Sequence, residues 1–599
     1  MCGFVGLISE NINIKKANTS LQKLNNRGPD EENFYNKENV YFGHKRLVVV
    51  DKENGKQPFY FNQYIMVYNG ELYNTEELRQ DLMQKGYTFN GHSDTEVLIK
   101  VFAEYKSKCP EKLNGIFSFA VWNTQEKTLF VCRDRLGVKP LFYCQKENSF
   151  MISSEIKSIL HYFDINQVDI NGLQEVLGLG PSHSPSKAIY SGVKELRSGH
   201  YLVYKNNKIV IKKYWDLISQ PFTDNLKTTI EKVRFLVEDA IKRQLVSDVP
   251  LCTLLSGGLD SSIITLIAKQ YKPNLQSYSI DYKKNELYFE KNDFQVSRDN
   301  DYIDLLVQHF GINHHYEFIS NIQLIDNLIP ALTFKDYPGM VDIDSSLYWF
   351  SKQIKKNFTV ALSGECADEI FGGYPWYYKE VAHDGFPWIR NLQERTNLLS
   401  DKYKNKLDLI NYVHQKYDET LNEVPLNNTE NEAEKKHKQM FILNTHWFMQ
   451  NLLERKDRMT MGASLEVRVP FADHRLIEYL YNVPWEYKYL NNLEKGLLRE
   501  AVKDIVPEEI LYRKKNPYPK TFNPEYKKMV GKLLTNCLNK PDSILLELFD
   551  KQVLNNLINS EELKGENPWY GQLMTRPQLL AYLYQIDMWF RLYNLNIKE

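Results

Sequence analysis

The chain has 599 residues, more than one compact core usually contains, so we expect at least two domains. Hydrophobic residues make up 43% of the sequence, which is enough for packed cores, and the net charge of −1 gives no electrostatic basis for binding nucleic acid or an anionic membrane. The sequence contains no run of about 18 apolar residues, so no membrane-spanning helix is predicted.

The seven cysteines indicate a reducing compartment. They are spread along the chain without the paired spacing of metal ligands, and their odd number argues against a disulfide framework. The N-terminus also lacks the basic, long apolar and small-residue pattern of a secretory signal. We therefore expect a cytoplasmic protein that binds neither nucleic acid nor a membrane.

Short, aromatic-rich strands dominate the chain up to about residue 210. The runs 40–44, 64–68 and 115–122 alternate as half-buried strands do, and a helix is expected at about 75–86. The pair Asn69-Gly70 is a typical turn signal that follows the second of these runs. The pattern predicts a β-rich α+β domain, which we place at residues 2–212.

The pattern changes after a polar junction at 219–225. An amphipathic helix is predicted near 227–245, and the continuous apolar run 249–255 is typical of a buried parallel strand. A helix at about 261–270 and a strand at 276–280 follow. This strand–helix–strand order predicts an α/β domain with a parallel sheet covered by helices.

The rest of the chain has mostly helical patterns. We therefore assign residues 226–599 to a second domain, an α/β parallel sheet with a helical C-terminal part. A polar stretch near 421–436 is expected to be mobile.

A loop with two glycines follows the predicted strand 249–255, in the sequence Ser256-Gly257-Gly258-Leu259-Asp260-Ser261-Ser262. Glycines let backbone N–H groups curve around an anion, and a helix N-terminus behind the loop adds unpaired donors. The loop lacks the lysine of a Walker motif. A bare Ser-Gly-Gly is as readily an ordinary turn, but the added aspartate and serine pair favour a phosphate-binding loop.

A second loop of this kind follows the predicted strand 358–362, in the sequence Ser363-Gly364-Glu365-Cys366-Ala367-Asp368-Glu369. In a parallel sheet both loops lie at the carboxyl ends of strands, where such folds bind ligands. Asp260 and Asp368 would then be placed to share a Mg²⁺ ion bound to polyphosphate. Either acid alone would more often be a solvated surface charge.

These motifs resemble those of glutamine-dependent asparagine synthetases. The first loop resembles the pyrophosphate loop of AMP-forming, N-type ATP pyrophosphatases, and residues 363–374 resemble the SGEGADE-FGGY signature of the synthetases. The resemblance extends over nearly the whole chain through four further segments, 457–461, 465–471, 497–500 and 513–517.

The resemblance implies a role for Cys2 as an N-terminal nucleophile of a class II glutamine amidotransferase. If Met1 is removed, Cys2 carries a thiol and a free α-amine together. Such an amine titrates near about 7.7–8.0, so part of it is neutral at pH 7 and able to accept the thiol proton. Without this context, Cys2 would more often be a small buried hydrophobe.

The same resemblance implies a glutamine site around this cysteine. The Asn69 amide and the Gly70 N–H would form an oxyanion hole, and Arg46 would bind the substrate α-carboxylate through its planar fork. The implied glutamine-binding set is Arg46, Leu47, Val49, Asn69, Glu71 and Asp94. The segment 27–30, Arg-Gly-Pro-Asp, is predicted as a turn without a chemical role.

In the second domain the resemblance implies that Glu365 helps to form an acyl-AMP. The implied ATP-binding set is Leu255, Ser256, Gly257, Gly258, Asp260, Ser261, Ser262, Ile280, Ser363, Gly364 and Arg458. Two positions depart from the family pattern. Cys366 replaces a usual glycine, which is costly if this position needs φ > 0, and Arg458 replaces a frequent lysine, which preserves the charge but changes donor geometry.

The activity implied is synthesis of asparagine from aspartate, glutamine and ATP with Mg²⁺, through an acyl-AMP and a sheltered path for ammonia. A sister amidotransferase with another carboxylate acceptor is an alternative, because 516–521 departs from the commonest forms of the family. A third alternative is a catalytically silent sensor, which binds glutamine or ATP without turnover. The intact Cys2, Glu365 and both aspartates argue against it. A β-lactam synthetase-like ligase would lack the terminal cysteine. Whether chains pair into a homodimer is left open.

Overall fold

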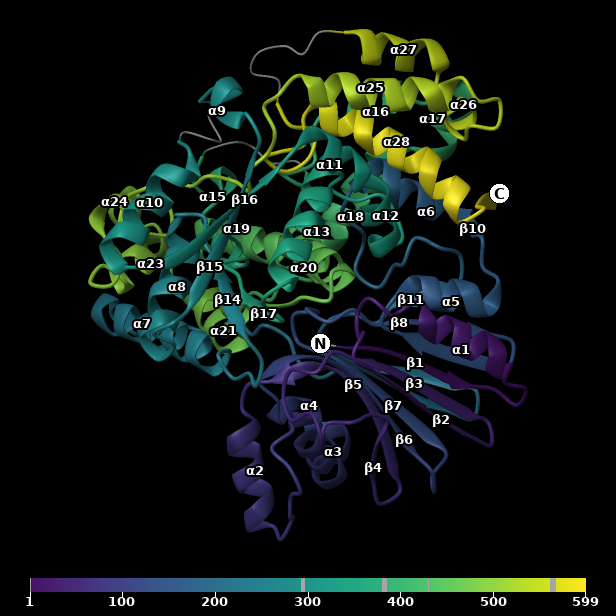
Figure 1. Cartoon of the computed structure of the whole chain (residues 1–599), viewed down its shortest axis with the longest axis vertical. Coiled ribbons are helices and arrows are strands. Elements are labelled where there is room, and N and C mark those ends of the chain that lie inside the picture. The colour runs from purple at the N-terminus through teal and green to yellow at the C-terminus, as the bar shows by residue number, and fades with distance from the viewer. Residues whose placement is uncertain (1, 292–296, 380–384, 429, 561–566, 599) are drawn as a thin grey trace.

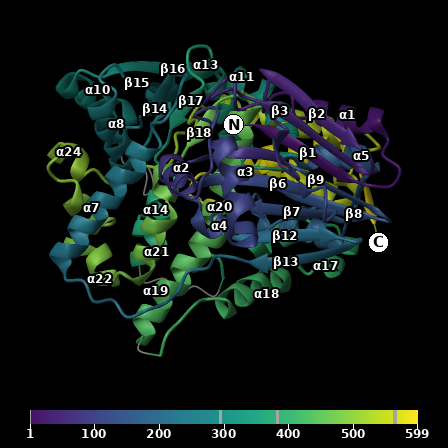
Figure 2. The same cartoon turned by 90° about the horizontal axis from the view of Figure 1, so that it is seen from below.

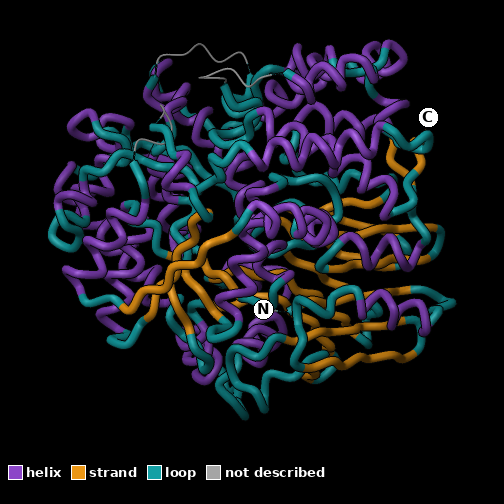
Figure 3. Tube along the Cα trace, turned by 45° about the horizontal axis from the view of Figure 1, so that its top comes forward, coloured by secondary structure: helices purple, strands orange, loops and turns teal. Residues whose placement is uncertain are grey.

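The computed structural model describes residues 2–291, 297–379, 385–428, 430–560 and 567–598. Figure 1 shows a sheet-rich N-terminal domain beneath a larger, mainly helical second domain. The strands of the parallel sheet form a group of their own, apart from those of the antiparallel sheets (Figures 2 and 3). No helix in these ranges is long and apolar enough to cross a membrane.

The N-terminal domain contains two six-stranded antiparallel sheets. The first has the order β11 (Val193–Glu195), β8 (Phe142–Lys146), β9 (Ser149–Ser153), β1 (Gly3–Ile8), β3 (Val40–Arg46), β2 (Glu31–Lys37). The second has the order β13 (Lys208–Lys213), β12 (His200–Lys205), β7 (Thr128–Arg133), β6 (Gly115–Asn123), β5 (Tyr64–Leu72), β4 (Phe59–Phe61). Alternate residues such as Phe4, Phe42, Val67 and Ala120 form the core between the sheets.

Helices cover the outer faces of both sheets, which gives a four-layer αββα domain. Helices α1 (Ile14–Gln22) and α5 (Ile156–Phe163) pack on the first sheet, and α2 (Thr75–Gln84) and α3 (Asp94–Tyr105) pack on the second. The predicted β-rich α+β domain is confirmed, with its last sheet strand ending at Lys213.

The predicted turn at Asn69-Gly70 is wrong. Both residues lie inside strand β5, where they pair with Ser118 and Phe117 of β6. A Cβ atom at position 70 would lie 2.7 Å from the Phe117 Cα, so the close approach of the two backbones accounts for the glycine. Strand pairing therefore overrides the local turn preference of the dipeptide.

The second domain contains the predicted parallel sheet. Its order is β16 (Asn313–Ile319), β15 (Gln276–Tyr282), β14 (Leu251–Leu254), β17 (Val360–Leu362), β18 (Glu466–Arg468). Val360 and Leu362 face the core formed with α7 (Leu226–Arg243) and α8 (Leu259–Tyr271), whereas Ala361 faces the core formed with α13 (Asp342–Lys355). Burial of both faces explains why these strands have continuous apolar runs.

The remaining elements are mostly helices. They are α4 (Cys109–Lys112), α6 (Ile170–Gln174), α9 (Asn285–Tyr288), α10 (Asp299–Phe310), α11 (Asn321–Asp326), α12 (Leu328–Lys335), α14 (Ala367–Phe371), α15 (Pro375–Tyr378), α16 (Leu392–Asn397), α17 (Asp401–Leu407), α18 (Leu409–Asn422), α19 (Glu432–Leu443), α20 (Met449–Gly462), α21 (His474–Asn482), α22 (Trp485–Lys488), α23 (Gly496–Ala501), α24 (Glu508–Leu511), α25 (Glu525–Leu538), α26 (Leu545–Leu548), α27 (Lys551–Asn559) and α28 (Arg576–Leu592).

The expectation of a mobile stretch at 421–436 needs correction at both ends. Helix α18 extends to Asn422, and α19 begins at Glu432 with a capping box between Asn431 and Glu434. The capping box satisfies backbone N–H groups that a helix start otherwise leaves unpaired, so this polar composition forms a helix N-terminus. Residue 429 lies outside the described residues.

The C-terminal segment returns to the N-terminal domain. Strand β19 (Asn596–Lys598) pairs in parallel with β10 (Gln167–Asp169), so the C-terminus lies beside β10 (Figure 1). This pairing joins residues more than four hundred positions apart, and no local sequence pattern announces it.

A buried ion cluster joins the two domains. Asp457 of α20 accepts hydrogen bonds from Arg27 Nη1 at 2.7 Å and from Lys139 Nζ at 3.0 Å, both of the N-terminal domain. Arg27 also donates from Nε to the backbone oxygen of Cys2 at 3.0 Å. The segment 27–30, expected to be a plain turn, therefore fixes the position of Cys2 and holds the domain contact.

Replacing Asp457 with alanine is expected to destabilise the fold by about 3–5 kcal/mol, because the buried Lys139 would lose its carboxylate partner and Arg27 would lose one of the two carboxylates that pair with it. A clear drop in the thermal unfolding midpoint would show this. The matched control is Asp542→Ala, which removes an exposed partner of Arg591 and should change the midpoint little. Equal midpoints for the two variants would contradict the role given to the cluster.

Candidate active sites

A small cavity of about 30 Å³ lies at Cys2 in the N-terminal domain. The structure brings together there most of the residues predicted to bind glutamine. These are Arg46, Leu47, Val49, Gly70, Glu71 and Asp94, which line the cavity with Cys2. Asn69 is also at the site, because its Oδ1 accepts a hydrogen bond from the Cys2 backbone N at 3.0 Å.

Asn69 has a free donor at this site. Its Nδ2 is buried and has no hydrogen-bond partner among the described residues. Burying a donor without an acceptor costs about 1–3 kcal/mol, so this group requires a partner such as a ligand or a water molecule. The donor fits the predicted oxyanion hole, which needs a fixed N–H beside the nucleophile.

The Cys2 thiol is in an environment that keeps it protonated. It is 8% exposed, and burial raises its pKa although the nearby Arg46 cation acts in the opposite direction. Its Sγ donates to the backbone oxygen of Leu47 at 3.9 Å. His44 nearby is no proton acceptor, since its Nε2 bonds the Tyr68 backbone oxygen and burial lowers its pKa to about 3. A base for this thiol must therefore come from elsewhere, as the proposed terminal amine would.

The charged residues around the cavity are held from several directions. Arg46 donates to Glu31 at 2.9 Å and to the Asp51 backbone oxygen at 2.7 Å, which fixes its guanidinium against the following loop. Asp94 accepts from the Tyr68 hydroxyl at 2.8 Å, and burial raises its pKa.

Glu71 has a partner that sequence reasoning missed. Arg468 of strand β18, in the second domain, lies 3.5 Å from the Glu71 carboxylate. The Arg468 backbone oxygen also accepts from Ser363 N at 2.9 Å, on the loop of the second site. Strand β18 therefore contacts both candidate sites. The sequence gives Arg468 only as part of a family motif, without indicating this contact.

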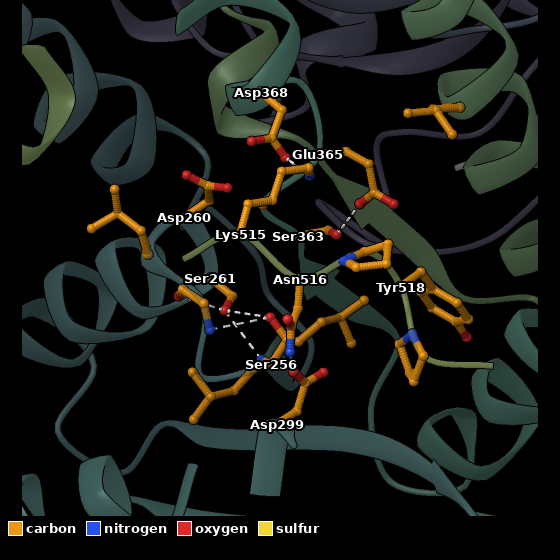
Figure 4. A pocket seen from close by; sticks show the side chains of 18 of the residues that line it. Ser256, Asp260, Ser261, Asp299, Ser363, Glu365, Asp368, Lys515, Asn516 and Tyr518 are labelled. Carbon is orange, nitrogen blue, oxygen red and sulfur yellow. Dashed lines mark hydrogen bonds and ion pairs between the residues drawn. The ribbon is translucent and has the colours of Figure 1, made fainter. Parts of the chain in front are cut away.

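The second cavity has a volume of about 240 Å³ and lies at the carboxyl ends of β14, β15 and β17 (Figure 4). Of the predicted residues, it is lined by Leu255, Ser256, Gly258, Asp260, Ser261, Ile280, Ser363, Gly364, Glu365 and Asp368. The two loops thus meet in one cavity, as their positions after parallel strands require.

Gly257 and Ser262 shape the first loop without lining this cavity. Gly257 has φ of 65°, and a Cβ atom there would lie 2.8 Å from the Tyr302 Cβ. The Ser262 hydroxyl donates to the Gly258 backbone oxygen at 2.7 Å. Both residues therefore support the loop conformation, and their contact with ATP stays a prediction.

Lys495 forms ion pairs with both predicted metal ligands, Asp260 and Asp368. Its Nζ lies 2.8 Å from Asp260 Oδ2 and 3.0 Å from Asp368 Oδ1. Lys515 pairs with Asp368 as well. Burial opposes ionisation of Asp368, but the two lysines outweigh it and hold the pKa of this carboxyl below its usual range. Burial raises the pKa of Asp260.

The two aspartates fit a Mg²⁺ ion that also binds phosphate. Mg²⁺ usually takes one or two carboxylates and completes its shell with phosphate oxygens and water. In the described ranges no group of three or more His, Cys, Asp or Glu side chains forms a cage made by protein alone. Phosphate ligands are therefore needed at this site, and Mg²⁺ binding stays a prediction.

Glu365 is held by basic residues of α20. Lys456 Nζ lies 2.9 Å from Glu365 Oε1, and Arg455 Nη2 lies 3.6 Å from it. Burial disfavours the charged form of Glu365, but these cations lower its pKa. Lys456, Lys495 and Lys515 all line the cavity and were missed as site residues. The basic run 513–515 lies within the segment 513–517, which was identified in the sequence as part of the family resemblance without a role for its lysines.

The predicted contact of Arg458 with ATP needs correction. Arg458 does not line the cavity and is fully buried. Its guanidinium lies 3.3 Å from Asp336 and 3.4 Å from Glu155, in the ion cluster between the domains. Successive residues of α20 point to different sides, so that Lys456 faces the cavity while Arg458 faces the cluster.

Cys366 adopts the costly conformation that its position suggested, with φ of 79°. A left-handed residue other than glycine loses about 1–2 kcal/mol through the Cβ clash with the backbone. We expect Cys366→Gly to unfold at a higher temperature than Cys366→Ala, because only glycine removes this clash. Thermal unfolding of the two variants side by side tests this, and an alanine variant as stable as the glycine variant would contradict it.

The fold and the two cavities define a class: a glutamine amidotransferase domain joined to an ATP-using synthetase domain. A family model described as "Asparagine synthase" matches residues 232–591, and one described as "Glutamine amidotransferase domain" matches residues 1–215. The chain belongs to the glutamine-hydrolysing asparagine synthetase family.

Relatives from Bacillus subtilis (strain 168) cover the chain almost completely. "Asparagine synthetase [glutamine-hydrolyzing] 3" is 49% identical over an alignment of 613 positions, which covers 100% of both chains. "Asparagine synthetase [glutamine-hydrolyzing] 1" is 30% identical and covers 94% of this chain and 95% of its own. From Escherichia coli (strain K12), "Asparagine synthetase B [glutamine-hydrolyzing]" is 25% identical, with 86% and 82% covered.

Proposed function

We propose that this protein makes asparagine from aspartate, glutamine and ATP, with glutamate, AMP and pyrophosphate as the other products. The observation that supports it most is the grouping of the predicted residues into two cavities of one chain. One cavity holds Cys2 with the unpaired Asn69 donor, and the other holds Glu365 with Asp260 and Asp368. The match to the asparagine synthase family model agrees with it.

In the first cavity, Cys2 would attack the side-chain amide of glutamine once Met1 has been removed. The α-amine takes the thiol proton, and the thiolate forms a thioester with release of ammonia. The Asn69 amide and the Gly70 N–H stabilise the negative oxygen that develops during attack. Arg46 would bind the glutamine α-carboxylate, and Glu71 and Asp94 would accept from its α-ammonium.

In the second cavity, the side-chain carboxylate of aspartate would attack the α-phosphate of ATP. This gives an acyl-AMP and pyrophosphate, and ammonia then displaces AMP to form the amide. Asp260 and Asp368 would hold Mg²⁺ together with phosphate oxygens, and the ion would offset charge on the polyphosphate. Lys456 orients Glu365 toward this chemistry, and Lys495 and Lys515 add positive charge beside the phosphate loops.

Ammonia would need a sheltered route between the cavities, because most of it is protonated and unreactive in neutral water. Strand β18 supports a close connection, since Arg468 contacts Glu71 at one site and the Ser363 loop at the other. We further propose a cytoplasmic location, which agrees with seven cysteines that are all free and buried.

A second candidate is a sister amidotransferase that amidates a different carboxylate. The observation in its favour is that Asn516, Pro517, Tyr518 and Pro519 line the ATP cavity, within the segment that departs from the commonest family pattern. These side chains are placed where an acceptor would contact them. The acceptor must therefore be established by experiment.

The test is pyrophosphate release with glutamine and ATP across a panel of carboxylic acids that includes aspartate, glutamate and larger amino-dicarboxylates. We expect aspartate to give by far the highest kcat/KM, with asparagine formed in equal amount to pyrophosphate. Preference for another acid would favour the sister amidotransferase. No release with any acid, despite binding of glutamine or ATP, would favour a sensor.

A further inference from the structure

A third cavity, of about 260 Å³, lies apart from both candidate sites. Its walls come from the interdomain junction at 220–222, from α14, from α19 and from the segment 481–488. None of the residues proposed to bind glutamine, ATP or metal lines it. It does share α14 with the ATP cavity, because Ile370 faces this cavity and Asp368 faces the other.

Lys488 is a buried lysine in this wall. It is 7% exposed, and in the described part of the chain its Nζ has neither a hydrogen-bond acceptor nor a carboxylate partner. Its Nζ lies 4.8 Å from the centre of the Phe441 ring. Burial and the nearby Lys438 lower the pKa of Lys488 to about 7. A buried ammonium without a counter-charge is costly, and an anion in the cavity would remove that cost.

The other ionisable groups of the cavity have different partners. Lys438 forms an ion pair with Glu430, and the Glu434 carboxylate accepts from the backbone at the start of α19. The His437 ring stacks on Trp485 at 4.5 Å, and burial lowers its pKa to about 4, so it is uncharged at neutral pH. Among the described residues that line the cavity, Lys488 is therefore the cation without an ion pair, and Glu434 is the anion without one.

Aromatic and apolar side chains form the remaining surface. Trp485 stacks on Tyr377 at 5.8 Å, and Phe222, Phe441 and Ile370 also line the cavity. A ligand that satisfies both features needs one anionic group and an apolar body. Small-molecule sites commonly combine an apolar lining with one or a few placed polar groups.

We propose that this cavity is a binding site for a small organic carboxylate, whose charge pairs with the Lys488 ammonium while its apolar body packs against Phe441 and Trp485. The carboxylate is separate from the glutamine and aspartate of the reaction. A carboxylate bound in this cavity would contact both the interdomain junction and α14.

The test uses benzoate as the probe and the purified full-length protein, with binding measured by isothermal titration calorimetry. We expect saturable binding at one site per chain. Lys488→Met should weaken benzoate at least about tenfold, because a charge-assisted contact is lost. The matched control, Lys436→Met, removes an exposed lysine of α19 and should leave binding unchanged. Unchanged binding in Lys488→Met, or no saturable binding to the wild type, would overturn the proposal.

A second comparison needs no variant, so that misfolding of Lys488→Met cannot decide the outcome. Methyl benzoate has the same ring without the charge. We expect the wild type to bind it at least about tenfold more weakly than benzoate. Equal affinity for the two compounds would show that Lys488 does not select an anion, and would contradict the assignment.

Discussion

Replacing Cys2 with alanine is expected to abolish asparagine formation from glutamine and to spare its formation from ammonium salts. The variant lacks the sulfur that forms the thioester, whereas the second cavity keeps all its residues. Loss of a nucleophile of this kind lowers the rate by roughly 10³-fold or more. Both activities are measured by asparagine and AMP production, with glutamine or ammonium chloride as nitrogen donor.

The matched control for this prediction is Cys109→Ala. Cys109 is another fully buried cysteine of the N-terminal domain, and no catalytic role is proposed for it. Its variant should keep both activities. If Cys2→Ala lost glutamine and ammonium use equally, the separation into two sites would be wrong. The mass of the purified chain should also show that Met1 is absent, because a retained Met1 would block the proposed α-amine.

Asp260→Asn is expected to stop pyrophosphate release with either nitrogen donor. Asparagine has nearly the same shape as aspartate, but it cannot carry the charge that pairs with Lys495 at 2.8 Å and that would bind Mg²⁺. Removing one preorganised electrostatic contact of this kind commonly costs about 10²–10³-fold in rate. Pyrophosphate release is followed with saturating ATP and aspartate, first with glutamine and then with ammonium.

Asp301→Asn serves as the control, because Asp301 is an exposed acid at the start of α10. Glutamine hydrolysis without ATP should persist in Asp260→Asn, which distinguishes a local effect from general unfolding. Pyrophosphate release at the wild-type rate would remove Asp260 from the ATP site.

Residues whose role follows from a short local pattern could be predicted from the sequence. Asp260 and Asp368 each lie six residues after a strand of the parallel sheet, in the first turn of the next helix, and parallel strands bring their carboxyl ends together. Cys2 was identified through its place beside the chain terminus and the family pattern around it. The sheet of the second domain followed from continuous apolar runs, since burial of both faces leaves little room for polar alternation.

Residues whose role comes from distant contacts could not be predicted. Lys495 lies on a segment without a distinctive pattern and meets Asp260 only because the chain returns more than two hundred residues later. Arg468 reaches Glu71 across the domain boundary. Arg458 and Lys456 differ by two positions on one helix, so the family pattern did not reveal which of them faces the cavity.

The turn preference of the dipeptide Asn69-Gly70 led to a wrong prediction. The dipeptide is a strong turn signal in isolation, but here it belongs to a nine-residue strand paired along its length with β6. Pairing places the Asn69 amide beside Cys2, which a turn would not achieve. The local rule therefore failed here at a residue with a proposed catalytic role.

Transfer of the glutamine amide nitrogen to aspartate tests the central claim most directly. The wild type is supplied with glutamine labelled with ¹⁵N in the side-chain amide, together with aspartate and ATP, and the asparagine formed is analysed by mass spectrometry. The account predicts ¹⁵N in the asparagine side-chain amide, with one AMP and one pyrophosphate for each asparagine. Unlabelled asparagine, or ¹⁵N recovered only as free ammonium while ATP is consumed, would contradict it.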